Sequence, residues 1–275
     1  GKCVQKTNDG GFIILGFANI EGEIWPAGDI WLLKTDSLGD TMWTRIYRGF
    51  NFPYGGWVEQ TLDGGYVLTG NWDCAYLLLL KTDKDGNTEW SKNYQWGSEQ
   101  IETGYCVRQT KDGGYIVATN MGLFKTDENG DSVWLKPWAG RCVQQTKDGR
   151  YFVLSGKNND IWFIKTNEQG DTLWTRTYGG NKGDVGYSAQ ETTDGGYVIA
   201  GITNSFGDGV WLVKTDVNGD IFWTRTFGEE DEINEAHSVQ QTSDGGYIIA
   251  GVTSGRGFFW RSSANQDRLV GLRWC

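Results

Sequence analysis

One short segment is written six times in this chain. It runs valine (alanine in one copy), four mostly polar residues, then Asp-Gly-Gly (Asp-Gly-Arg in one copy) and an aromatic residue, as in "VEQTLDGGYVLTG" and "VQQTSDGGYIIAG". Glycine supplies the positive φ that a tight hairpin turn needs, so each copy predicts two antiparallel strands joined by a turn. The six copies begin at Val4, Val58, Val107, Val143, Ala189 and Val239. Repetition of this kind predicts a repeat architecture rather than a single irregular sheet.

A second repeated block follows each of the first five hairpins. "VWLVKTDVNGDIFW", from Val210, is typical of the block, and its "NGD" predicts a second hairpin. Each repeat therefore supplies four strands in about 40–50 residues, which is the period of a β-propeller blade. One tryptophan recurs in the fourth strand, and we expect it to pack between blades: Trp43, Trp90, Trp134, Trp174 and Trp223.

The sixth repeat departs from the others after its first hairpin. "FFWRSSANQDRLVGLRWC" has neither "KTD" nor "NGD", yet it aligns without gaps on the fifth repeat, with Phe258 on Val210 and Cys275 on Phe227. We therefore predict an all-β, six-bladed propeller in which no strand is exchanged between the first and last blades. It forms a single domain over residues 1–275, with blades over approximately 3–49, 57–97, 106–138, 142–180, 188–228 and 238–275.

Charge narrows the classes of partner. The formal net charge is −10 and the sequence pI is about 4.7. An acidic chain does not neutralise phosphates, which argues against nucleic acid and against an anionic membrane surface. The longest apolar run, Tyr76–Leu80, is too short to span a bilayer.

The repeat pattern DGGY-[IV]-[IV]-A-G … W-L-[IV]-K-T-D-x-N-G-D-x-x-W resembles repeat proteins of bacteria and archaea that form secreted or surface-exposed β-propellers. "VWLVKTDVNGDIFW" also resembles, more distantly, the repeats of quinoprotein-like propellers. The resemblance covers roughly residues 3–257. It implies a propeller outside the cell or on its surface. It transfers no catalytic residue, because the apparatus of a quinone-dependent dehydrogenase is not recognisable here.

Three features of the sequence are candidate sites of chemistry. The D-x-N-G-D turns, such as Asp216, Asn218 and Asp220, offer oxygen ligands that calcium accepts, but tight turns favour the same residues for backbone reasons. His237 is the only histidine, and one histidine does not build the usual zinc site, so we expect a solvated loop residue. The acidic run over 228–235 is expected to be a solvated loop. We predict no catalytic residue and no cofactor, with calcium at the turns as the alternative.

The five cysteines are expected to lie on one face of the propeller, because each falls near the same end of a predicted strand. They are candidate disulfide partners in an oxidising environment. Pairing of the two chain ends would close the ring, and a pair among the three central cysteines would tie blades two, three and four. Free thiols in small pockets are the other interpretation. The candidates are Cys3, Cys275, Cys74, Cys106 and Cys142.

The same face carries variable loops with many aromatic residues, which suit packing against a protein or stacking on sugars. The loops differ between repeats, and this favours one irregular surface over a sugar site repeated in each blade. The candidate interaction residues are Trp25, Tyr54, Trp57, Trp72, Trp96 and Trp138. We predict a non-catalytic extracellular or cell-surface protein that associates with copies of itself, as a homo-oligomer or a filament or tube. A carbohydrate-binding module is the alternative.

Overall fold

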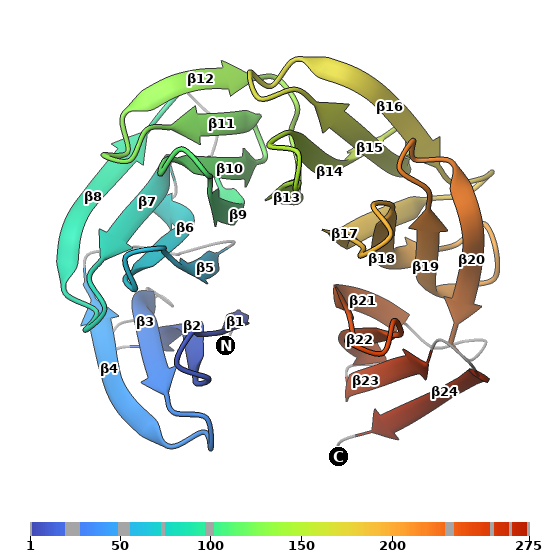
Figure 1. Cartoon of the computed structure of the whole chain (residues 1–275), viewed down its shortest axis with the longest axis horizontal. Helices are drawn as coiled ribbons and strands as arrows, with labels where there is room; N and C mark the ends of the chain where they lie inside the picture. The colour runs from blue at the N-terminus through green and yellow to red at the C-terminus, as the bar shows by residue number, and fades with distance from the viewer. Residues whose placement is uncertain are drawn as a thin grey trace. The chain divides into compact units, whose positions relative to one another are not determined.

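The sequence folds into sheets only, wherever the structure describes it. The computed structural model describes residues 2–19, 28–48, 56–72, 75–96, 102–228, 234–253, 256–263 and 266–273. Within these ranges no helix occurs, and 24 strands form six four-stranded antiparallel sheets (Figure 1). Each sheet consists of four strands consecutive in the chain. The protein is therefore a six-bladed β-propeller without a swapped strand, as predicted.

The chain divides into two compact units, Gly1–Val143 and Gln144–Cys275. The first three blades lie in the first unit. Blade one contains β1 (Cys3–Lys6), β2 (Phe12–Asn19), β3 (Gly28–Thr35) and β4 (Thr41–Tyr47). Blade two contains β5 (Trp57–Gln60), β6 (Tyr66–Trp72), β7 (Tyr76–Thr82) and β8 (Thr88–Tyr94). Blade three contains β9 (Gly104–Gln109), β10 (Tyr115–Thr119), β11 (Leu123–Thr126) and β12 (Ser132–Lys136).

The fourth blade begins at the end of the first unit, and the remaining strands lie in the second. Blade four contains β13 (Cys142–Gln145), β14 (Tyr151–Lys157), β15 (Asp160–Thr166) and β16 (Thr172–Tyr178). Blade five contains β17 (Asp184–Glu191), β18 (Tyr197–Thr203), β19 (Gly209–Thr215) and β20 (Ile221–Phe227). Blade six contains β21 (Asn234–Gln241), β22 (Tyr247–Thr253), β23 (Arg256–Ser263) and β24 (Gln266–Arg273).

The last blade differs from its expected register. A gapless alignment on blade five predicts that Phe258 faces Cys275, since Val210 faces Phe227. In the structure Phe258 faces Arg273 instead. The reason is a shorter connection between β23 and β24: Ser263 pairs with Gln266, whereas in blade five Thr215 pairs with Ile221. The gapless alignment was therefore wrong in register, although the blade has its four strands.

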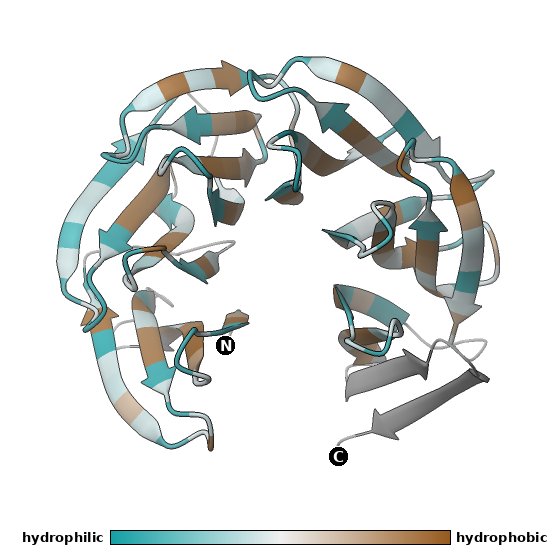
Figure 2. Ribbon diagram, viewed as in Figure 1, coloured by the Kyte–Doolittle hydropathy of each residue, from teal (hydrophilic) through white to brown (hydrophobic). Residues whose placement is uncertain are grey.

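The apolar core lies on the middle strands of the blades (Figure 2). In blade two, β7 is buried from its second residue onward, which explains why "LLLL" shows no alternation. The fourth strands alternate between exposed and half-buried residues, as β8 does, because they form the outer edge of each sheet. A continuous apolar run thus marks the centre of a blade, and an alternating strand marks its edge.

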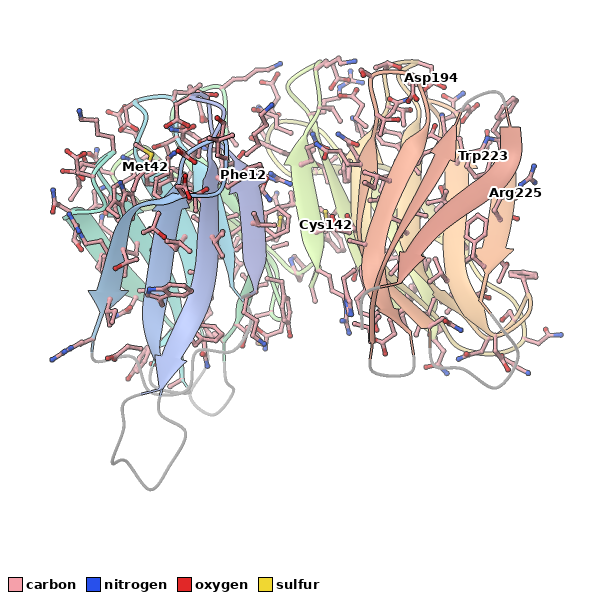
Figure 3. The ribbon with its side chains drawn as sticks, turned by 90° about the horizontal axis from the view of Figure 1, so that it is seen from below. Phe12, Met42, Cys142, Asp194, Trp223 and Arg225 are labelled. Atoms are coloured by element: carbon pink, nitrogen blue, oxygen red, sulfur yellow. The ribbon has the colours of Figure 1, made fainter. Side chains whose placement is uncertain are left out.

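The lysine of each "KTD" segment, which reads "KTN" in blade four, is buried and bonded within its own blade. Lys34 Nζ lies 2.8 Å from Asp9 Oδ2, and Lys214 Nζ lies 2.9 Å from Asp194 Oδ2. Each lysine is about 95% buried, whereas each aspartate belongs to an exposed D-G-G turn (Asp194, Figure 3). The same pair recurs in the other three of the first five blades: Lys81–Asp63, Lys125–Asp112 and Lys165–Asp148. The turn aspartate therefore pairs a buried charge, which a buried ammonium requires.

Neighbouring blades are held by an aromatic contact that repeats. The fourth-strand tryptophan of one blade meets the tyrosine of the next D-G-G-Y segment edge to face, and the ring centroids of Trp43 and Tyr66 are 5.8 Å apart. The contact recurs as Trp90–Tyr115, Trp174–Tyr197 and Trp223–Tyr247. These four tryptophans lie between blades, as the sequence predicted.

A hydrogen bond accompanies that contact. The hydroxyl of Tyr178, at the end of β16, donates to the carbonyl of Gly219 in the next blade at 2.7 Å. Tyr47 donates to Gly86 in the same way at 2.8 Å, and Tyr94 donates to Gly130. In these three blades, the glycine of the turn before the fourth strand therefore accepts a bond from the preceding blade. Burial raises the pKa of Tyr178 above its usual range, so the hydroxyl stays a donor.

We predict that Asp194→Asn lowers stability at neutral pH and not in acid. The free energy of unfolding should fall by roughly 1–3 kcal/mol at pH 7, because the buried Lys214 loses its charged partner. Desolvation raises the pKa of Asp194, but hydrogen bonds from Thr192, Lys214 and the amide of Gly196 outweigh it and lower the pKa to about 2. The pair therefore stabilises fully above the unfolded carboxyl pKa near 4 and loses this effect as the pH falls towards about 2.

Thermal melts of the wild type and Asp194→Asn at pH 7, 5, 4 and 3 check this. The difference in melting temperature should shrink over the last two steps. A difference that stays constant down to pH 3 would contradict the assignment.

We also predict that Tyr178→Phe destabilises the protein by about 1 kcal/mol, because the carbonyl of Gly219 loses its donor while the ring packing is kept. Chemical denaturation measures this. Tyr105→Phe is the matched control, since Tyr105 is exposed and should change stability by less than about 0.5 kcal/mol. Equal effects of the two substitutions would show that the hydroxyl bond contributes nothing.

Candidate functional site

In blades one, two, three and five, one position on the first strand contacts the first strand of the next blade. It is the residue before the repeated valine or alanine: Cys3, Trp57, Cys106, Cys142, Ser188 and Ser238. The thiol of Cys3 donates to the carbonyl of Val58 at 3.8 Å, and the thiol of Cys106 donates to the carbonyl of Val143 at 3.5 Å. The hydroxyl of Ser188 accepts from the amide of Val239 at 3.2 Å. We call this the first-strand position.

An arginine lies beside this position in the first unit. Arg108, on β9, has its guanidinium 4.6 Å from the ring centroid of Trp57, and its Nη1 is 3.6 Å from Glu59 Oε1. The other oxygen of Glu59 accepts a hydrogen bond from the amide of Gln109 at 3.1 Å. The Arg108 Nε is buried and has no hydrogen-bond partner in the described part of the chain. Strands β5 and β9, which pack side by side, thus hold one charge pair and one cation–π contact.

Burial shapes the electrostatics of this cluster. It raises the pKa of Glu59, and Arg108 opposes that shift. Burial alone would lower the pKa of Arg108, but the Glu59 carboxylate and the neighbouring thiols raise it above its usual range. Burial also raises the thiol pKa of Cys3 and of Cys106. The thiols are therefore protonated at neutral pH, and a protonated thiol is a poor nucleophile.

The cluster can do two things chemically. It can hold an ion pair whose strength depends on the charge of Glu59, and it can join thiols that lie on neighbouring first strands. Among the described residues, no three His, Cys, Asp or Glu side chains lie close enough to hold a metal ion.

The structure describes three of the five candidate cysteines. Cys3, Cys106 and Cys142 are buried and carry reduced thiols, each at the first-strand position of its blade (Cys142, Figure 3). Cys74 and Cys275 lie outside the described residues, so closure by Cys3 and Cys275 stays a prediction.

Sequence reasoning missed Arg108 and Glu59. Both occupy the x of "V-x-Q-T", where the fourth and sixth repeats have glutamine, and their opposite charges in consecutive repeats were the available signal.

The candidate aromatic residues are divided between the core and the undescribed loops. Trp57 is half-buried and packs against the core that blades one and two share and against the core that blades two and three share. Trp96 stacks on Tyr94 at 5.9 Å between centroids and meets Phe124 edge to face at 4.6 Å. Trp138 is half-buried. Trp25, Tyr54 and the side chain of Trp72 lie outside the described residues. The interaction surface on the loops therefore stays a prediction.

The D-x-N-G-D turns show how their oxygens are used. Oδ1 of Asp216 accepts hydrogen bonds from the amides of Asn218 (2.9 Å) and Asp220 (2.8 Å), which lower the pKa of Asp216. Asp127 makes the same two bonds in blade three, to Asn129 and Asp131. This is the backbone role that turn chemistry favours. Calcium binding at these turns stays a prediction.

The expectation that His237 lies in a loop was wrong. His237 is on β21, which begins at Asn234 because a bulge after Ala236 lets the strand extend further than the repeat predicted. Its Nε2 lies 3.4 Å from Glu235 Oε2, and its ring centroid is 5.3 Å from that of Tyr187 on β17. The histidine is exposed.

Comparison with solved structures supports the fold. The chain is similar to the Dos1 propeller (11% identity, TM-score 0.58), covering 90% of this chain and 66% of that one. It is similar to a quinoprotein alcohol dehydrogenase-like protein from Bacteroides thetaiotaomicron, at 10% identity and a TM-score of 0.62. That match covers 98% of this chain and 65% of the other. It is also similar to a puromycin hydrolase, at 14% sequence identity and a TM-score of 0.67. That match covers 98% of this chain but only 46% of the hydrolase.

A putative exported protein from Bacteroides fragilis is also similar, at 11% identity and a TM-score of 0.52, with 99% of this chain and 80% of that one covered. No protein-family model and no curated protein matches the sequence. At these identities the likeness shows the β-propeller fold alone. Within the described ranges, the structure offers no helix with the length and apolarity to cross a bilayer.

We predict that Arg108→Met destabilises the protein at pH 7 by roughly 2 kcal/mol, because Glu59 loses its counter-charge. Burial already raises the pKa of Glu59, and loss of Arg108 should raise it further. A carboxyl with a raised folded pKa costs stability when it ionises, so the deficit should be smallest below the unfolded pKa near 4 and grow as the pH rises. Melting curves between pH 4 and 7 measure it. Addition of Glu59→Gln should recover part of the loss, and no recovery would contradict the pairing.

Proposed function

We propose that this propeller is a non-catalytic interaction protein that acts outside the cell and associates with copies of itself. The observation that carries the proposal is a recurring exposed apolar residue on the outer strands. The residue before the wedge tryptophan is Met42, Val133, Leu173 or Phe222 in four of the first five blades (Met42, Figure 3). All four are exposed, and Phe222 is 77% exposed. Apolar side chains displayed on sheet edges favour contact with another protein.

Blade five presents an aromatic residue together with two further exposed apolar side chains. Val217 in the "VNGD" turn and Ile221 at the start of β20 are more than half exposed, and both are near Phe222 in the chain. The two outer-strand arginines nearby are already engaged: Arg176 pairs with Asp220 at 3.0 Å, and Arg225 lies over the Trp223 ring. The arginine side chains near this turn and strand are therefore already used within the protein. The exposed apolar side chains are the ones left to contact a second copy. An aromatic residue of this kind often carries much of the energy of an interface.

The repeated ionisable residues support a non-catalytic role. The lysines and aspartates that recur from blade to blade pair with each other, as Lys214 and Asp194 do. The turn aspartates accept backbone amide hydrogen bonds, as Asp216 does. The repeats thus use their charges to build blades. The similarity to a putative exported protein and the resemblance to secreted repeat propellers support a location outside the cell.

Phe222→Glu tests the proposal with little risk to the fold. Blade two carries Glu89 at the equivalent position, where it pairs with the buried Lys81 at 2.8 Å. We expect the wild type to self-associate in sedimentation velocity and Phe222→Glu to weaken association by at least about tenfold. Leu173→Glu is the matched control. It changes the equivalent position in blade four, where Leu173 follows a threonine instead of a second exposed apolar residue.

A wild-type protein that sediments as a monomer at high concentration would overturn self-association. Retention of that monomer on a glycan column would favour the carbohydrate-binding alternative. Equal weakening by the two glutamate substitutions would show that the contact is not centred on the apolar group of blade five.

A further inference from the structure

The thiols of Cys106 and Cys142 meet between two consecutive first strands. Cys106 Sγ lies 3.5 Å from the carbonyl of Val143, the residue that follows Cys142. The Cys106 side chain also shares a hydrogen bond with that of Cys142. Both side chains are buried, with 1% and 5% of their surfaces exposed. The Cys106 thiol therefore lies against the start of β13, beside the residue that carries the second thiol.

The geometry follows from the repeat. The first-strand position of one blade contacts the first strand of the next, and Cys3 makes the corresponding bond to Val58 at 3.8 Å. The residue before Val58 is Trp57, so Cys3 faces no thiol there. Cys106 is different because the next blade has cysteine at the same position. Of the contacts at this position that the structure describes, this one brings two thiols together.

We propose that Cys106 and Cys142 form a disulfide that joins the first strands of blades three and four when the protein folds in an oxidising environment. The oxidant is a small-molecule or protein disulfide. The thiolate of one cysteine attacks that disulfide and displaces one thiolate, forming a mixed disulfide. The second cysteine then attacks the protein sulfur and displaces the other thiolate. The two cysteine protons pass to the two released thiolates, so two thiols are oxidised as one disulfide is reduced.

Burial sets when the bond can form and break. In the folded protein, burial raises the thiol pKa of Cys106, and Arg108 offsets only part of that shift. A protonated, buried thiol exchanges slowly. The bond should therefore form during folding, before β13 covers Cys106. For the same reason, a reductant should not break it in the native protein unless a denaturant is present.

Peptide mapping tests the pairing. The protein is refolded with a mixture of oxidised and reduced glutathione, alkylated with iodoacetamide and digested with trypsin without reduction. We expect one cross-linked species that joins the peptide of residues 93–108 to the peptide of residues 142–147. Refolding a mixture of unlabelled and ¹⁵N-labelled chains should give no hybrid cross-link, because the bond is within one chain. Alkylation of both cysteines, or pairing of either one with another cysteine, would overturn the proposal.

Stability provides a second measurement. The oxidised protein should melt roughly 10 °C above the reduced one, because the bond restricts the unfolded segment between the cysteines. Cys106→Ser and Cys142→Ser should each abolish this difference. Serine occupies the same position as Ser188 and Ser238 in the last two blades, so the fold should accept it. Cys3→Ser is the control and should keep the difference. Loss of the difference in the control as well would assign the effect to another pair.

Discussion

The contact between one blade's outer tryptophan and the next blade's D-G-G-Y tyrosine is the interaction on which the fold depends. A single four-stranded sheet cannot bury both faces, so its stability comes from its neighbours. The glycine of the "NGD" turn belongs to the same contact. Gly219 has φ +78°, and a Cβ there would lie 2.8 Å from the ring of Trp174 in the preceding blade. Glycine is thus required both by the turn and by the ring packed against it. Because the carbonyl of Gly219 also accepts the Tyr178 hydroxyl, one short turn fixes the spacing of two blades.

The buried lysine is the second constraint, and it acts within a blade. Lys214 is held by Asp194 and by the carbonyl of Thr215 at 2.7 Å, so its charge is satisfied without any help from the outer strand. This leaves the residue before the wedge tryptophan free to vary: Glu89 adds a second pair to its lysine, whereas Phe222 adds none and points outward. The repeat therefore separates positions that build the blade from positions that can acquire a function without a cost to the fold.

The period and turn chemistry were enough to predict the strands, the blade count and the wedge tryptophans, because each of these is specified locally and repeated. The Arg108–Glu59 pair was not predicted, because it depends on which residues of neighbouring first strands face each other. That information comes only from the packing of blades. His237 was misplaced for a related reason: the bulge that extends β21 leaves no turn residue in the sequence. The register between β23 and β24 was missed because the sequence between Ser263 and Gln266 lacks the repeated "NGD" turn and is shorter than the turn of blade five.

Residues that differ between the repeats can serve a specific function, because the repeated residues are already needed for the fold. The first strands show this most clearly. In the x of "V-x-Q-T", a neutral glutamine in one repeat becomes Glu59 in another and Arg108 in the next, and the two charges meet. One residue earlier, serine in the last two blades is replaced by cysteine in blades three and four, and the two thiols meet. In both cases, paired substitutions in consecutive repeats create a contact that neither would make alone. Chance replacement of single residues would leave an unpaired charge or a lone thiol, and the cost of burying an unpaired charge would select against the first. The charge pair lies between blades two and three, and the two thiols lie between blades three and four. Departures that pair across neighbouring blades are therefore the physical reason to look for the specific properties of this propeller on its first strands.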